Sequence, residues 1–162
     1  MPVTNITKDL DTRSLIITAH FAAPVERVWQ LYADPRQLER IWGPPTYPAT
    51  FVAHSLTPGG LVHYYMTSPE GERFHGGMRI LTVDEPHGFT FEDFFADDSY
   101  APAEGMPVSR CSYVFEADGD GTTATYTTVY ETAEALQQVL EMGMEEGSRE
   151  SINQIDALLA EG

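Results

Sequence analysis

The sequence predicts an α+β fold in which a curved antiparallel sheet is covered by a long C-terminal helix. Two observations support this prediction. Residues 131–159 have the apolar spacing of an amphipathic helix, interrupted by Gly143 and Gly147. The region before it contains a series of strand patterns separated by short turns. At 162 residues the chain has the usual length of one domain, so we expect a single domain spanning 1–162 with its core at about 14–159.

A strand and two short helices are expected first. Residues 14–21 are rich in β-branched and apolar side chains, and Pro24 then provides a favourable first residue for a helix. From residue 25 to residue 32 apolar side chains recur at i, i+3, i+4 and i+7, as on one face of a helix. Asp34 followed by proline is an N-cap signal for a second helix, which the Gly-Pro-Pro run at 43–45 ends.

Six more strands are expected before the C-terminal helix. Turn residues separate them, including an Asp-Gly-Asp-Gly run that is typical of a hairpin and lacks the remaining ligands of a calcium loop. The connection at 96–107 is longer and acidic, as expected of a rim loop. With the first strand they make a seven-stranded antiparallel sheet. The six segments are 47–55, 61–68, 74–83, 89–95, 108–117 and 122–131.

The two glycines of the C-terminal helix have two interpretations. Each costs an interior helical position about 1 kcal/mol relative to alanine, so we expect a reason for their presence. Gly143 and Gly147 could leave room for a ligand between the helix and the sheet. They could equally allow the helix to pack closely on a strand or on the pair of short helices.

The charge balance excludes several classes of partner. The chain has 25 acidic and 9 basic residues, a formal net charge of −16. Such a surface repels phosphate backbones and anionic lipid, so we expect no nucleic-acid partner and no membrane binding. No apolar run approaches the ~20 residues of a membrane-spanning helix, and the first residues lack a signal-peptide pattern. The single cysteine, Cys111, forms no intrachain disulfide, and a cytoplasmic protein is expected.

Four short motifs occur in order along the chain: AAPVERVW at 22–29, LERIWGP at 38–44, PGG at 58–60, and MGM at 142–144 followed by Gly147. Together they resemble the START-like (SRPBCC) superfamily, which includes birch-pollen-allergen-like proteins. Within it they resemble the branch named after the activator of the heat-shock-protein-90 ATPase. The resemblance implies a helix-grip fold, with a seven-stranded sheet wrapped on the C-terminal helix and two short helices after strand 1. Where the branch commonly has two adjacent tryptophans, this chain has Ile41 and Trp42.

A candidate ligand pocket follows from the alternation of side chains along strands. Neighbouring residues of a strand face opposite sides of a sheet, so one face of 61–66 carries Val, Tyr and Met. Aromatic and methionine side chains suit a flat or aliphatic small molecule, although the same residues could simply fill a core. The candidate pocket residues are Trp42, Val62, Tyr64, Met66, Met78, Phe91, Tyr113, Met142, Gly143 and Gly147.

Catalytic signals are weaker. The candidate proton-transfer residues are His75 and Glu92, with Tyr64 as a third. His63 and Asp93 are alternative partners on neighbouring strands. A sheet surface collects such residues by chance. The chain has no zinc signature, nucleophile elbow, phosphate loop or dinucleotide fingerprint, so neither a metal nor a cofactor is expected.

Three functions remain open from the sequence. A noncatalytic module that binds a small lipid-like or aromatic ligand in the cavity is favoured. The resemblance implies the second, a stress-response protein that associates with a chaperone. The third is an enzyme, of cyclase or hydrolase type, acting within the same cavity. A homodimer through an edge strand or through residues 42–47 is a further expectation.

Overall fold

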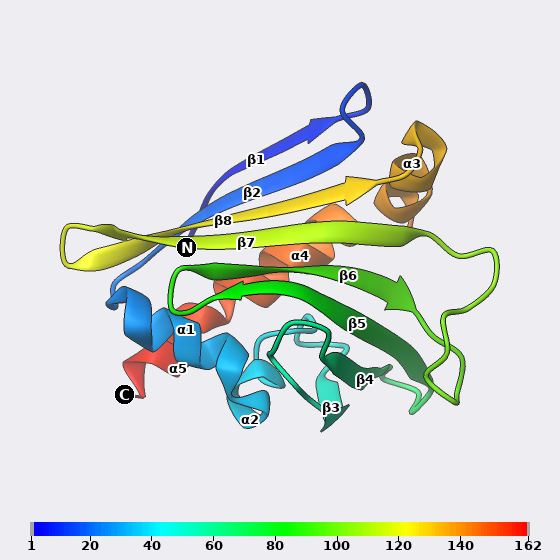
Figure 1. Cartoon of the computed structure of the whole chain (residues 1–162), viewed down its shortest axis with the longest axis horizontal. Helices are drawn as coiled ribbons and strands as arrows, with labels where there is room; N and C mark the ends of the chain where they lie inside the picture. The colour runs from blue at the N-terminus through cyan, green and yellow to red at the C-terminus, as the bar shows by residue number, and fades with distance from the viewer. Residues whose placement is uncertain (1, 162) are drawn as a thin grey trace.

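The protein, described over residues 2–161 by a computed structural model, is built on one eight-stranded antiparallel sheet (Figure 1). The strand order is β1-β2-β8-β7-β6-β5-β4-β3, so β3 to β8 form the expected meander and β2 pairs with the last strand. The strands are β1 (Val3–Asp9), β2 (Ser14–Phe21), β3 (Ala49–Ala53), β4 (Leu61–Thr67), β5 (Arg73–Asp84), β6 (Gly88–Phe95), β7 (Val108–Asp118) and β8 (Gly121–Tyr130).

The first strand corrects the expected count of seven. β1 pairs antiparallel with β2, and Ile6 lies opposite Ile17. Its sequence, VTNITKD, is mostly polar because β1 is an edge strand whose side chains are exposed or half-buried. An edge strand lacks the apolar alternation that identifies a buried one. The two short helices therefore follow the second strand rather than the first.

The two short helices begin where the sequence indicated. α1 (Val25–Ala33) buries Val28, Trp29 and Tyr32 along one face. α2 (Pro35–Leu38) starts with the Asp34 side chain accepting a hydrogen bond from the backbone N–H of Arg36 at 2.9 Å. It ends after one turn, so Trp42 lies in the connection to β3.

The long C-terminal helix is a series of three shorter ones, which is a second correction. These are α3 (Ala133–Glu141), α4 (Met144–Asn153) and α5 (Ile155–Ala160). Gly143 separates the first two because its backbone has φ of +90°, the left-handed conformation that ends helices and that favours glycine. Gly147, by contrast, lies inside α4 and does not interrupt it.

The core lies between one face of the sheet and the helices. α4 crosses one face of the sheet and leads to α5 (Figure 1), and between them Gln154 donates a hydrogen bond to the backbone carbonyl of Gly43 at 2.7 Å. Ile152, Ile155 and Leu158 of α4 and α5 are buried in the same cluster as the inward-facing strand residues. Under α1 this interior is aromatic and tightly packed: the Tyr32 ring stacks on Phe115 with centroids 5.3 Å apart.

Candidate functional site

Most of the predicted pocket residues gather around Trp42. Its ring centroid lies 5.8 Å from that of Tyr64, 6.3 Å from Phe91 and 6.4 Å from Tyr113. Tyr64 and Phe91 are buried, as are the neighbouring Val62 and Met78. Met66 is partly buried against the same cluster. Side chains from the α2–β3 connection, β4, β5, β6 and β7 therefore meet on the inner face of the sheet.

The helical residues predicted for the pocket do not join this group. Met142 is 56% exposed, and Gly143 is exposed as well, because the helix breaks at that point. Met144, two residues after Met142, packs inward instead. The Tyr130 hydroxyl donates a hydrogen bond to the Met144 sulfur at 3.3 Å. A Cβ placed on Gly147 would meet nothing within 4 Å, so close packing does not explain that glycine.

A hydrogen bond between Tyr64 and Asp93 sets the chemistry of the inner face. The Tyr64 hydroxyl donates to Oδ1 of Asp93 at 2.8 Å. Gly76, opposite Tyr64 in the register, makes this possible: a Cβ there would lie 2.5 Å from the Tyr64 ring. The missing side chain lets the ring lie across β5 and carry its hydroxyl to β6.

Asp93 points inward because it follows Phe91 by two residues on β6 and lies opposite Met78 of β5. Burial raises the pKa of Asp93 from 3.8 to about 7, against the opposing effect of the hydrogen bonds from Tyr64 and from the backbone N–H of Phe94. Burial, and then the nearby Asp93, raises the pKa of Tyr64 well above its ordinary value. Tyr64 is therefore a neutral donor, while Asp93 changes its charge near neutral pH.

Further polar side chains adjoin Asp93 at the end of the sheet next to α3. In the register Asp93 lies opposite Ser109, which lies opposite Tyr130. The Ser109 hydroxyl is 3.6 Å from the Cys111 sulfur, which is 3.9 Å from the Thr128 hydroxyl. Burial, followed by the charge of Asp93, raises the pKa of Cys111 to about 12. The interior is thus aromatic under α1 and polar towards α3.

Several inward-facing side chains are not fully covered. Tyr113, central on β7, has Phe91 and Tyr126 within 5.1 Å between ring centroids and is still only half-buried. Trp42, Met66 and Asp93 also keep some accessible surface. These four side chains are therefore less completely covered than the buried Phe91 and Phe115 on the same face.

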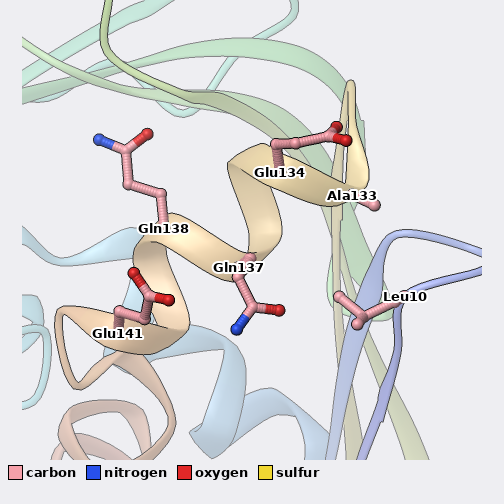
Figure 2. Close-up of a pocket in the computed structure, with 6 residues that line it drawn as sticks. All are labelled: Leu10, Ala133, Glu134, Gln137, Gln138 and Glu141. Atoms are coloured by element: carbon pink, nitrogen blue, oxygen red, sulfur yellow. The ribbon is translucent and has the colours of Figure 1, made fainter.

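Two adjoining hollows, of about 290 and 540 Å³, lie elsewhere on the described surface. Both are formed between the β1–β2 turn and α3, where Leu10 faces Gln137 and Glu141 (Figure 2). The expected cavity lies between the inner face of the sheet and the C-terminal helix, so these hollows are not that cavity. The rim is rich in carboxylates and amides, and none of the predicted pocket residues contributes to it.

The candidate catalytic residues lie on the outer face of the sheet and apart from each other. Glu92 binds Arg79 and also Arg110, the latter at 3.3 Å, and these arginines lower its pKa. His75 contacts Tyr65 and Tyr100, with ring centroids 5.9 and 5.2 Å apart. Arg79 of β5 lies opposite Glu92 in the register. His75 precedes Arg79 by four positions on β5, so it lies about 13 Å along the sheet from Glu92.

Within residues 2–161, no group of three or more His, Cys, Asp or Glu side chains is arranged to hold a metal ion. No helix there has both the length and the apolar character needed to cross a bilayer.

The comparisons with known proteins agree with the fold. The family model for Activator of Hsp90 ATPase homolog 1-like protein matches residues 22–160. The chain is 58% identical to protein Ms6760 from Mycobacterium smegmatis, over 98% of this chain and 97% of that one, with a TM-score of 0.91. It is 44% identical to a protein from Arthrobacter aurescens, over 99% and 93% of the chains, with a TM-score of 0.94. A search of curated proteins found no match.

Proposed function

Because this chain belongs to the Activator of Hsp90 ATPase homolog 1-like family, a branch of the START-like superfamily, we propose that it is a noncatalytic binding module. Its ligand is a small apolar or aromatic molecule held between the inner face of the sheet and the C-terminal helices. The region matched by the family model, residues 22–160, contains Trp42 and the aromatic residues around it, Tyr64, Phe91 and Tyr113.

The incomplete cover of Tyr113 carries this proposal. A ring at the centre of the inner face, surrounded by Trp42, Phe91 and Tyr126, would be fully buried in a sealed core. Its remaining accessible surface supports a space next to the aromatic cluster. Aromatic walls with a few polar groups are typical of small-molecule sites.

The enzymatic alternative receives less support. Glu92 is held between two arginines, and its lowered pKa makes it a poor proton acceptor at neutral pH. His75 lies on the outer face, away from the inner cluster. The acidic group on the inner face is Asp93, which has no histidine as its hydrogen-bond partner in the described chain.

A fluorescence titration tests the proposal. The neutral probe N-phenyl-1-naphthylamine becomes brighter in an apolar site, and we expect saturable binding to the wild-type protein. Met66→Trp should weaken this binding by about tenfold or more, because the larger side chain fills the space beside the cluster. Leu61→Trp is the matched control, since Leu61 is on the same strand but exposed on the opposite face. Absence of saturable binding, or equal loss in both variants, would overturn the proposal.

A further inference from the structure

Asp93 is an interior carboxylate without a cationic partner. Among the ion pairs formed within residues 2–161, none includes Asp93. Carboxylates are rarely placed on the inner face of a fold unless they are paired, because desolvation of the charge is costly. On the same strand, the adjacent outward-facing Glu92 has two arginine partners, whereas Asp93 has none among the ion pairs of residues 2–161. An unpaired interior carboxylate beside an aromatic cluster indicates a functional position.

The carboxylate also has unused acceptor capacity. An ionised carboxyl group offers about four lone-pair positions to donors. The Tyr64 hydroxyl takes one on Oδ1, and the backbone N–H of Phe94 supplies a second donor. Ser109 directs its hydroxyl at the backbone carbonyl of Asp93, at 3.5 Å, rather than at the carboxylate. Asp93 can therefore accept a further hydrogen bond from a molecule that reaches it.

The surroundings of Asp93 define the rest of such a molecule. Tyr64 links the carboxylate to Trp42, and Trp42 continues to the half-buried Tyr113. An aromatic or aliphatic body lying against these rings would bring one end next to Asp93. While Asp93 is ionised, that end must donate a hydrogen bond, because an acceptor or an anion would be repelled by the carboxylate. The net charge of −16 disfavours anions further.

We propose that Asp93 is the specificity-determining residue of the inner site and that it selects ligands with an apolar body and one hydrogen-bond-donating end, a hydroxyl or an ammonium group. This inference rests on the proposed function, since it assumes that the inner face takes a ligand. It adds the chemical class of that ligand and the atom that recognises it. The Tyr64 hydroxyl holds the carboxylate in place and leaves its remaining lone pairs directed to the ligand.

The test uses four naphthalene probes of similar shape and different ends: 1-naphthylmethylamine, 1-naphthylmethanol, 1-methylnaphthalene and 1-naphthoic acid. Isothermal titration calorimetry at about pH 8 keeps most of the Asp93 carboxyl ionised. The wild-type protein should bind the amine roughly tenfold to hundredfold more tightly than methylnaphthalene, with the alcohol between them and the acid weakest. This comparison needs no variant.

Asp93→Asn should remove the preference for the amine and leave the affinity for methylnaphthalene within about twofold. Glu92→Gln is the matched control. Glu92 directly precedes Asp93 on β6 and faces the opposite side of the sheet, and its substitution changes the net charge by the same amount. Loss of the preference in Asp93→Asn alone supports the inference.

The two proposals fail in different ways. Equal binding of methylnaphthalene and the donor probes, or a preference that survives in Asp93→Asn, overturns the role of Asp93 and leaves the ligand site standing. A preference lost equally in Glu92→Gln assigns it to overall charge and also overturns that role. If none of the four probes binds, the ligand site itself is refuted, and the role of Asp93 with it.

Discussion

Replacing Asp93 with asparagine should stabilise the protein, and the gain should grow with pH. The pKa of Asp93 is 3.8 in an open chain and about 7 in the folded protein, because burial penalises the charged form. For an acid whose pKa is raised on folding, the folded state binds the proton more tightly. Stability is therefore lost as pH rises from the unfolded pKa towards the folded one, and the whole cost is present above about pH 7.

The expected size follows from the two pKa values. A difference of about 3 pH units at 1.36 kcal/mol each amounts to about 4 kcal/mol near pH 8, and to about 1 kcal/mol near pH 4.5. Asparagine has nearly the same shape and its side-chain oxygen can still accept from Tyr64, so the variant removes the charge and little else. The urea unfolding free energies of the two proteins should thus diverge by about 3 kcal/mol over this range.

The difference between the two proteins is the quantity to measure, because repulsion among the other acidic residues affects both. Asp97→Asn is a control: hydrogen bonds from Ser99 lower the pKa of Asp97, so it is ionised in both folded and unfolded states throughout the range. Its difference from wild type should stay constant with pH. A constant difference for Asp93→Asn as well would refute the assignment of Asp93 to a desolvated interior position.

Three other predictions follow from the glycines and the cysteine. Gly147→Ala should raise the unfolding free energy by about 1 kcal/mol, because the position is helical and open. Gly143→Ala should lower it by about as much, because φ at Gly143 is +90°. The urea midpoints of the two variants should therefore lie on either side of the wild-type midpoint. Gly76→Ala should cost about 1–3 kcal/mol, measured by thermal unfolding, because the new methyl group displaces the Tyr64 ring. The Cys111 thiolate should be about a thousandfold scarcer than that of an ordinary thiol, since its pKa rises from 9.0 to about 12. A thiol reagent should then react only under denaturing conditions, and rapid reaction with the folded protein would contradict the burial.

The sequence was sufficient for the meander and for the face of the sheet on which several aromatic side chains lie. Alternation along strands placed Val62, Tyr64 and Phe91 on one face because that face is buried, and buried strands keep a strict period of two. The same alternation could have placed Asp93 beside Phe91. A carboxylate two residues after an inward-facing phenylalanine is such a signal, although the sequence pattern first suggests Asp93 only as the partner of a histidine.

The parts that could not be predicted depend on contacts distant in sequence or on a backbone conformation that the pattern leaves open. β1 is polar and forms only because β2 offers an unpaired edge, which residues 3–9 do not reveal by themselves. The break at Gly143 depends on a backbone conformation, since one glycine in a helical pattern is compatible with either a continuous or an interrupted helix. As a direct consequence Met142, which was expected in the pocket, is exposed, and Met144 packs inward.

Asp93 and Gly76 are best understood together. A core selected for stability alone would place an apolar side chain at residue 93, avoiding a cost of about 4 kcal/mol near neutral pH. It would also avoid a glycine in the interior of β5, where glycine weakens a strand. Both unfavourable choices serve one arrangement, the Tyr64 hydroxyl held at 2.8 Å from an interior carboxylate. A weakened strand position and a desolvated carboxylate that both serve one pair of groups indicate a site that recognises a ligand. The pH-dependent stability of Asp93→Asn and its loss of amine selectivity measure the two sides of that arrangement independently.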